Sequence, residues 1–402
     1  MPVPPRPHPL ARAPLVEKIN RWLSRAWDKG VLDRLVLTPE ALRDHVMKSA
    51  GDTSGEQGCR SAEDDADFSL RLEQICAALE NEARLNPLGR AMAHGQLTRA
   101  IRHRLQLGSL WDRQREIAQT KLAPPILVVG QMRSGTTRLH RLLAADPAHC
   151  ATRFCDSWHP VPQTFDMRPV WAGLALFWAR KLDPWIDALH PFGAARADEE
   201  LGWLASALDH SAYEAQWHIP SYVTFSEARD AAPIYREFAR ILATDAAHHG
   251  NAHQPRVMKV PQFAEDLGAL LGRFPDARVV VSRRAADETV RSAASLVANQ
   301  MTMQSDHVDL ADITREWERK AALRDARTEA ALARFGGPVA EVEFGRLSED
   351  WEGEIGKVYA ALDLPLTNPA MRAMQAEQER AARMDHADHA RQMAGFDQTD
   401  TG

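Results

Sequence analysis

The sequence lacks three features that would place it in a membrane or an oxidising compartment. It has no run of about eighteen consecutive apolar residues, so an ordinary transmembrane helix is not expected. Its N-terminal segment contains prolines in place of an apolar core, which is untypical of a signal peptide. The four cysteines show no C-x-x-C spacing, which argues against a zinc site or a disulfide framework. These absences predict a protein of the cytoplasm.

The chain also has no excess of positive charge. Its 49 lysines and arginines are outnumbered by 55 aspartates and glutamates, and the formal net charge is -6. No global field would therefore attract nucleic acid, and an anionic ligand would have to be held by local basic groups. At 402 residues the chain is long enough for one large or two ordinary domains.

The most informative stretch runs from Ile126 to Leu143 and predicts a strand, a loop and a helix. Ile126 to Val129 is a short apolar run, and leucines then recur at helical spacing. The loop between them, Gly130 to Thr137, can present backbone N–H groups at a helix N-terminus, where the helix dipole also favours an anion. The stretch therefore predicts a phosphate-binding loop.

This loop lacks the lysine of nucleoside triphosphatases. Thr136 stands where G-x-x-x-x-G-K-[ST] requires lysine, and the cation is Arg133 instead. A P-loop nucleotide kinase or nucleoside triphosphatase remains an alternative, although it also needs an acidic strand end for Mg²⁺. The predicted strand end at Ser282, Arg283 and Arg284 does not supply one.

Two further basic residues are expected at the same sheet edge. A short strand ends at Lys259, and a helix then leads to a strand that ends at Arg284. Ser292 follows Arg284 by two helical turns. A guanidinium can form two hydrogen bonds to a phosphate, and a serine hydroxyl can add another.

The Arg-Ser-Gly-Thr-Thr loop and the Arg-x7-Ser spacing resemble the donor-binding motifs of sulfotransferases that use 3′-phosphoadenosine-5′-phosphosulfate (PAPS). The segment from Glu80 to Met92 is similar to one bacterial branch of that family, and the resemblance extends over about residues 80 to 365. It implies an α/β, P-loop-like three-layer fold in which helices flank a central parallel sheet. It also implies transfer of a sulfuryl group from PAPS to a hydroxyl or amine of a small-molecule, lipid or sugar acceptor, without a metal.

The resemblance assigns roles to particular residues. It implies that Arg133 and Lys259 act on the transferring group and that Arg284 and Ser292 hold the 3′-phosphate. The expected contacts of the 5′-phosphosulfate are Arg133, Ser134, Gly135, Thr136, Thr137 and Arg138.

The catalytic histidine of the cytosolic animal enzymes is absent here, because Val260 and Pro261 follow Lys259. Asp156 is the first candidate for a general base, since a carboxylate can accept the proton of an acceptor hydroxyl. Helix capping is an alternative role for Asp156, and His159 is a rival base. The acidic cluster Asp198 to Glu200 is a further candidate for chemistry on the acceptor side.

The chain divides into three predicted parts. Residues 1–122 form a helical lobe, residues 123–366 form the α/β core, and residues 367–402 form a tail. Within the core, an insertion at 156–254 is rich in tryptophan, which suggests an apolar or aromatic acceptor. A member that binds the nucleotide without catalysis is a second alternative, and nothing in the sequence indicates an oligomeric state.

Overall fold

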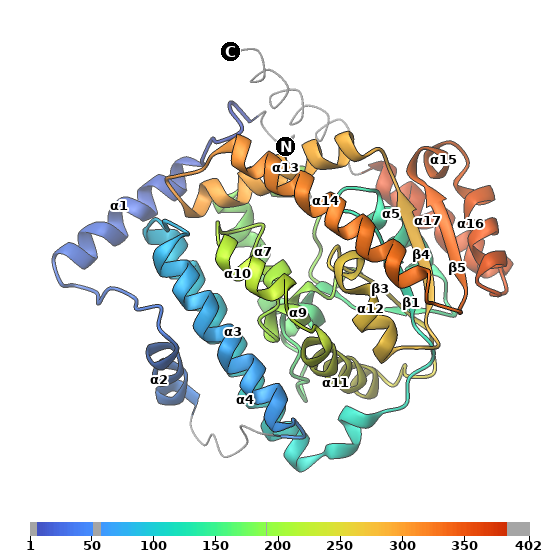
Figure 1. The fold of residues 1–402 in the computed structure, drawn as a ribbon, viewed down its shortest axis with the longest axis horizontal. Helices are drawn as coiled ribbons and strands as arrows, with labels where there is room; N and C mark the ends of the chain where they lie inside the picture. The colour runs from blue at the N-terminus through green and yellow to red at the C-terminus, as the bar shows by residue number, and fades with distance from the viewer. Residues whose placement is uncertain (1–5, 51–57, 190, 384–402) are drawn as a thin grey trace.

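The computed structural model describes residues 6–50, 58–189 and 191–383, and its centre is a parallel five-stranded sheet (Figure 1). The strands follow the order β2-β3-β1-β4-β5 across the sheet. Their bounds are β1 Ile126–Val129, β2 Cys150–Ala151, β3 Arg256–Lys259, β4 Arg278–Arg283 and β5 Val339–Glu343. Val128 of β1 pairs with Lys259 on one side and with Val280 on the other. The carboxyl ends of the three central strands therefore lie at one edge, and the predicted parallel sheet is confirmed.

Strand β1 is apolar throughout because both of its faces are covered. All four of its side chains are fully buried. Ile126 and Val128 pack in one cluster with residues of the helices at 136–145 and 351–361, whereas Leu127 and Val129 pack in another with residues of the helices at 232–249 and 263–273. A continuous apolar strand is the pattern expected for a sheet that is buried between two helical layers. The three-layer arrangement follows from this pattern.

The helices of the core alternate with the strands. Their bounds are α5 Thr136–Ala145, α11 Ala232–His249, α12 Phe263–Arg273, α13 Ala286–Gln304, α14 Leu310–Leu332, α15 Phe344–Glu349, α16 Trp351–Ala361 and α17 Asn368–Arg383. Helix α5 follows β1 directly, and α13 follows β4, so both begin at the edge where the strands end. Within the described ranges, no helix is long and apolar enough to cross a membrane.

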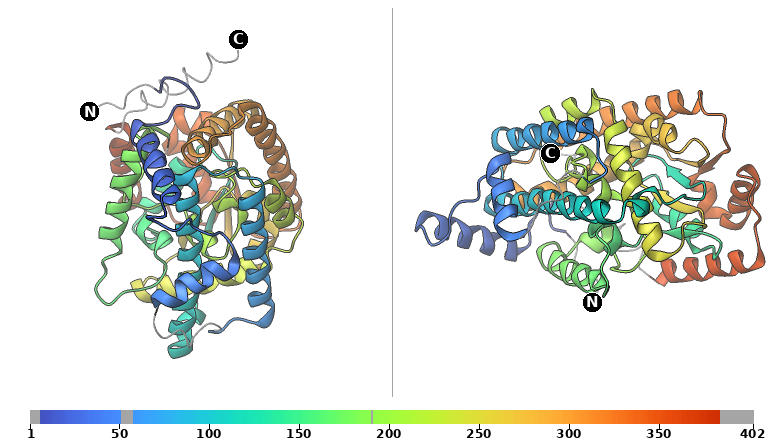
Figure 2. Two further views of the ribbon diagram at one scale, coloured as in Figure 1. Left: turned by 90° about the vertical axis from the view of Figure 1, so that its left-hand side faces the viewer. Right: turned by 90° about the horizontal axis from the view of Figure 1, so that it is seen from below.

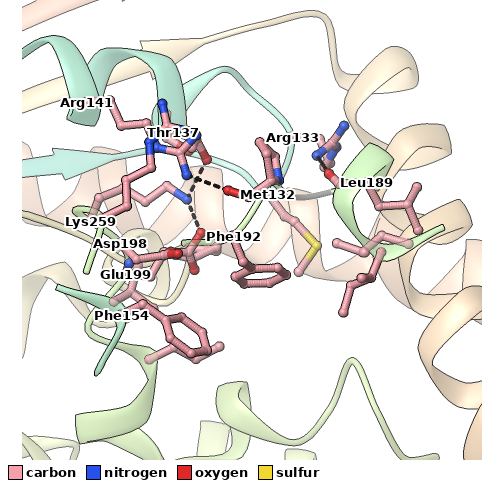
Figure 3. Close-up of a pocket in the computed structure, with 18 of the residues that line it drawn as sticks. Met132, Arg133, Thr137, Arg141, Phe154, Leu189, Phe192, Asp198, Glu199 and Lys259 are labelled. Carbon is pink, nitrogen blue, oxygen red and sulfur yellow. Dashed lines mark hydrogen bonds and ion pairs between the residues drawn. The ribbon is translucent and has the colours of Figure 1, made fainter. Parts of the chain in front are cut away.

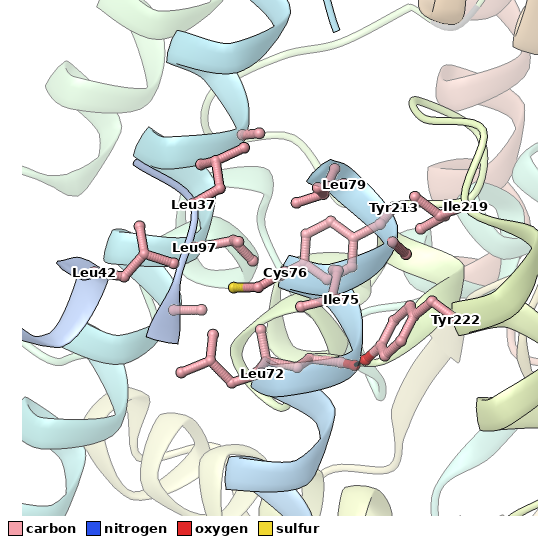
Figure 4. Packing of buried hydrophobic residues seen from close by; sticks show 14 of the residues in the cluster. Leu37, Leu42, Leu72, Ile75, Cys76, Leu79, Leu97, Tyr213, Ile219 and Tyr222 are labelled. Atoms are coloured by element: carbon pink, nitrogen blue, oxygen red, sulfur yellow. Dashed lines mark hydrogen bonds between the residues drawn. The ribbon is translucent and has the colours of Figure 1, made fainter. Parts of the chain in front are cut away.

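The first part of the chain is helical, as its sequence predicts. Its elements are α1 Pro14–Asp28, α2 Pro39–Ala50, α3 Ala62–Asn81, α4 Pro87–Arg113 and the 3₁₀ helix η1 Arg115–Gln119. Its apolar core continues into the insertion, because Tyr213 and Tyr222 pack against Leu72, Ile75 and Leu97 (Figure 4). The N-terminal helices are thus held in place by residues that follow β2 in the chain.

Two sequence expectations about local structure were wrong. The Gly-, Ser- and Asp-rich composition from Ser49 to Asp67 predicts a loop, but Ser61 and Asp64 form a reciprocal cap that starts α3. The sequence predicts a second strand from Ala151 to Phe154, but β2 is Cys150–Ala151 and Phe154 begins a short helix, α6. Residues 51–57 of the expected loop lie outside the described residues.

The insertion between β2 and β3 is helical. It contains α6 Phe154–Trp158, α7 Arg168–Leu182, α8 Ile186–Leu189, α9 Leu201–Ser206, η2 His210–Ala212 and α10 Pro220–Glu227 ahead of α11. Several of these elements line a cavity that opens at the carboxyl edge of the sheet, beside the N-terminus of α5.

Candidate active site

The loop between β1 and α5 ends in backbone donors that point out of the helix. Gly135 has a φ of 88°, in the left-handed region that glycine tolerates. Among the described residues, the amides of Gly135, Thr136 and Thr137 have no hydrogen-bond acceptor. Free amides at a helix N-terminus, together with the helix dipole, form a site for an anion. All three residues line the cavity.

Ser134 uses its hydrogen-bond donors within the loop. Its hydroxyl and its backbone N–H both donate to the carbonyl oxygen of Gln131, at 2.7 and 3.1 Å. Its own carbonyl oxygen accepts a hydrogen bond from Ser282 at 2.8 Å. Ser134 is buried and does not line the cavity. Because its donors are used inside the loop, its geometry favours shaping the turn over contacting a ligand.

Gly135 is needed for close packing as well as for its backbone angle. A Cβ at this position would lie 2.0 Å from Cδ2 of Phe344, the first residue of α15. The Arg284 guanidinium lies over the same Phe344 ring, 4.7 Å from the ring centre. Phe344 therefore links the anion-binding loop to the arginine at the end of β4. The sequence predicts a strand from Val339 to Phe344 without a role in the site for Phe344, although the position of this residue at the end of a predicted strand was a signal.

Arg284 and Ser292, the predicted pair, both form hydrogen bonds with Arg133 of the loop between β1 and α5. Nη1 of Arg284 donates to the carbonyl oxygen of Arg133 at 3.0 Å. Nε of Arg133 donates to the Ser292 hydroxyl at 3.0 Å, and its Nη1 donates to the carbonyl of Leu189 at 2.5 Å. The structure thus brings together three of the residues that the sequence singled out.

The side chain of Arg133 points away from the start of α5. Figure 3 shows it directed toward Leu189, whereas Thr137 and Lys259 lie on the opposite side of Met132. The resemblance to sulfotransferases implies that Arg133 acts on the transferring group. Its orientation instead favours a place beside Ser292, in the part of the site expected to hold the 3′-phosphate.

Lys259 is the cation that faces the start of α5. Its ammonium group donates to the Thr137 hydroxyl at 3.1 Å and forms an ion pair with Glu199. Its backbone N–H donates to the carboxyl group of Glu200 at 2.9 Å. Residues from β3, α5 and the acidic cluster therefore meet at one point of the cavity. Burial raises the pKa of Glu200 to about 8, so its carboxyl group is largely protonated at neutral pH.

Positive charge is concentrated around the loop. Burial, and then the nearby charge of Arg284, lowers the pKa of Arg133 to about 10. Two arginines that repel each other in this way are unfavourable without a shared anion. Arg138 and Arg141 also line the cavity, and burial lowers the pKa of both. The charge pattern suits a ligand with several negative charges.

Helix α17, which lies in the predicted tail at 367–402, forms part of the cavity wall. Arg138 donates to Gln378 at 3.3 Å and to Ser348 at 3.1 Å, so its side chain lies between α17 and α15. Gln375 and Glu377 also line the cavity. The predicted Gly-Phe-Asp segment at 395–397 lies outside the described residues.

Asp156 does not occupy the position expected of a general base. Its carboxylate is buried and accepts hydrogen bonds from Arg153 at 2.6 and 2.8 Å. Arg168 lies 3.2 Å away and His249 lies 3.4 Å away. Although burial opposes ionisation, these cationic partners hold the pKa of Asp156 far below its usual value. Asp156 does not line the cavity, and a carboxylate so strongly paired is a poor proton acceptor.

The cavity has a volume of about 1500 Å³ and two different halves. One half is the cationic region around α5. The other is lined by apolar side chains that include Phe154, Trp158, Leu176 and Phe192. His159 lines it as well, and burial together with nearby arginines lowers its pKa.

Trp158 is the one tryptophan of the described insertion that lines this cavity, and the others do not, contrary to the sequence expectation. Trp203 and Trp217 are in the core, and Trp185 is buried. Trp171 and Trp178 are about half exposed on the outer side of α7. The side of α7 that faces the cavity carries smaller residues. Trp171 and Trp178 cannot reach the cavity, because the width of the helix separates its two sides.

Two groups of side chains in the described part of the chain have the spacing of metal ligands. These groups are Asp156, Asp245 and His249, and His210, Glu227 and Glu265. In the second group, the Lys320 ammonium lies 2.8 Å from both glutamates and 3.1 Å from His210. In the first, arginine side chains pair with both carboxylates. The charges of both groups are already compensated by cations.

Together, the fold and the site define an α/β enzyme of the P-loop-like class, with a cationic cavity at the carboxyl edge of its sheet. The chain matches the model of the sulfotransferase family over residues 124–368, and it belongs to that family. It is therefore a transferase that moves a sulfuryl group, as the sequence predicts. The family match decides against the alternative of a kinase or nucleoside triphosphatase.

Solved structures agree with this assignment. Sulfotransferase STF1 from Mycobacterium tuberculosis has a TM-score of 0.76 and 26% sequence identity, and the match covers 91% of this chain and 98% of that chain. Sulfotransferase STF9 from Mycobacterium avium shares the fold, with a TM-score of 0.75, 18% identity and coverage of 87% and 89%. A comparison with curated proteins finds no match.

Proposed function

We propose that this enzyme takes its sulfuryl group from PAPS. The observation that carries the proposal is the meeting of two anion-binding elements in one cavity, the free amides at the start of α5 and the strand-end Arg284. PAPS carries a 5′-phosphosulfate and a 3′-phosphate, which would engage these two elements. In this arrangement Gly135, Thr136 and Thr137 hold the 5′-phosphosulfate, and Arg284 and Ser292 hold the 3′-phosphate together with Arg133.

Lys259 and Glu199 are the proposed catalytic residues. Lys259 lies beside Thr137 at the end of β3, where its charge can stabilise the phosphate oxygen that leaves sulfur. Glu199 contacts Lys259, so its carboxylate lies next to the same point. The acceptor oxygen forms a bond to sulfur, the bond from sulfur to the 5′-phosphate oxygen breaks, and Glu199 accepts the acceptor's proton. The products are a sulfate ester and adenosine 3′,5′-bisphosphate.

The acceptor is proposed to carry its hydroxyl on an apolar body. The apolar half of the cavity adjoins Glu199, so a hydroxyl that reaches the carboxylate would leave the rest of the acceptor among Phe154, Trp158 and Leu176. Aromatic and aliphatic walls favour an acceptor of this kind through burial of apolar surface. The four cysteines are all free, which fits the proposed location in a reducing compartment such as the cytoplasm.

The test compares Lys259→Met with a surface control, Lys357→Met. The screen incubates each protein with radiolabelled PAPS and a panel of phenols, sterols, sugars and long-chain alcohols. We expect Lys259→Met to lose at least about a hundredfold in kcat, because it removes charge from the transition state, while it still binds adenosine 3′,5′-bisphosphate. Lys357→Met should resemble the unmodified enzyme, since Lys357 is exposed on α16.

Two results would contradict the proposal. Unchanged turnover in Lys259→Met would remove Lys259 from the mechanism. Tighter binding of ATP with Mg²⁺ than of adenosine 3′,5′-bisphosphate, measured by calorimetry on the unmodified enzyme, would show that PAPS is not the donor.

A further inference from the structure

Helix α7 and the residues just before it expose an unusual amount of apolar surface. Seven of the twelve exposed large hydrophobic residues of the described chain fall between positions 165 and 178. They are Phe165, Met167, Val170, Trp171, Leu174, Phe177 and Trp178, and each is between 44% and 84% exposed. Single exposed apolar residues are normal, but a contiguous group of this size indicates an interaction surface.

These residues form one face of α7. Val170, Trp171, Leu174, Phe177 and Trp178 recur at intervals of three and four, which places them on one side of the helix. The opposite side carries Ala172 and Leu176, which are buried and line the cavity. Helix α7 is therefore a wall one helix thick, about 10 Å, with the apolar half of the cavity behind it.

Cations predominate on and beside α7, although Arg168 and Arg180 are paired with the flanking Asp166 and Asp187. The helix contains no acidic residue, and Lys181 continues the apolar face at its C-terminal end. Neighbouring α1 contacts α7, and Figure 2 shows the two helices side by side. One side of α1 exposes a row of cations around Trp22: Lys18, Arg21, Arg25 and Lys29. Within the described chain, none of these four cations has an acidic partner.

We propose that the outer face of α7 docks on the interfacial zone of an anionic lipid bilayer. Tryptophan and phenylalanine beside lysine and arginine are the combination that binds such a surface, because the rings enter the headgroup region and the cations pair with lipid phosphates. A second copy of the chain fits less well. It would present the same cations to one another, and like charges oppose association. Because the net charge of the chain is -6, attraction to an anionic surface has to come from local cations such as those of α1 and α7.

Docking would bring the acceptor half of the cavity to within one helix of the lipid. An acceptor with an apolar body could then pass from the bilayer into the cavity with little exposure to water. This consequence rests on the proposed function, whereas docking itself does not depend on sulfuryl transfer. The two are therefore tested separately.

The experiment measures co-sedimentation of the full chain with phosphatidylcholine vesicles, prepared with and without phosphatidylglycerol. We expect the unmodified protein to bind the anionic vesicles and to dissociate at high salt. The double variant Leu174→Ser/Phe177→Ser should bind about tenfold more weakly or worse, because it removes two large apolar side chains from the lipid contact. The control Met47→Ser, which alters an exposed residue of α2, should bind like the unmodified protein.

A charge variant keeps the test decisive if the double variant folds poorly. Lys181→Glu changes only an exposed side chain and should weaken binding to the anionic vesicles alone. Circular dichroism and turnover of a water-soluble acceptor should be unchanged in both variants. The proposal is overturned if the unmodified protein fails to bind either vesicle. It is also overturned if ultracentrifugation shows a dimer that Leu174→Ser/Phe177→Ser converts to monomers, because α7 would then be covered by a second copy.

Discussion

Replacing Gly135 with alanine is the sharpest test of the anion-binding loop. The new Cβ would meet two separate obstacles. The backbone angle of 88° disfavours any residue with a Cβ, at a cost of about 1 to 2 kcal/mol. The Cβ would also lie 2.0 Å from the Phe344 ring, and relieving such overpacking costs a further 1 to 3 kcal/mol or so. The total is at least about 2 kcal/mol.

This free-energy cost should appear chiefly as weaker binding of the sulfuryl donor and its nucleotide product. The loop can relax by displacing Phe344 and turning its amides away, and a bound anion must then restore the original arrangement. A cost of about 2 kcal/mol corresponds to roughly a thirtyfold rise in Kd. Calorimetric titration with adenosine 3′,5′-bisphosphate measures the affinity, and urea unfolding of the same variant measures any part of the cost that appears as lost stability.

Two further variants separate the causes. Gly135→Ala/Phe344→Ala removes the collision and keeps the backbone penalty, so its loss of affinity should be smaller than the sum of the two single losses. Gly268→Ala places a Cβ on α12 where no atom lies within 4 Å, and it should bind normally. The reasoning fails if Gly135→Ala keeps both the donor affinity and the stability of the unmodified enzyme.

Three other predictions follow from the charges at the site. Glu199→Gln should lower kcat by at least about a hundredfold with unchanged Kd for adenosine 3′,5′-bisphosphate, because it removes the proposed proton acceptor; equal kcat values in steady-state assays would exclude that role. Asp156→Asn should lower stability by about 3 kcal/mol or more, since the buried Arg168 and the partly buried Arg153 and His249 lose a charged partner, without affecting kcat per folded molecule. A large fall in kcat at an unchanged melting temperature would restore Asp156 as the base. Burial raises the pKa of Glu200 from 4.5 to about 8, so its contribution to stability is complete below about pH 4.5 and is lost as the pH rises to 8. Glu200→Gln should therefore gain stability relative to the unmodified enzyme by about 1.4 kcal/mol per pH unit between those limits, and urea unfolding curves that shift in parallel would contradict this.

The sequence by itself was enough for features that depend on neighbouring residues. A four-residue apolar strand, a glycine loop and an amphipathic helix form a local pattern, and each part appears where its spacing predicts. The interval from Arg284 to Ser292 is likewise set by the helical repeat, since Arg284 lies just before α13 and Ser292 lies about two turns into it. These motifs sufficed for the family and for the parallel sheet.

Only the tertiary structure decided how these groups are paired. Lys259 meets Glu199, and Phe344 covers Gly135, across separations in the chain that no local pattern encodes. Asp156 has the residue type of a base, yet packing surrounds it with cations and removes it from the cavity. Burial and long-range contacts set the charge and orientation of a side chain, whereas local spacing sets only the backbone that carries it.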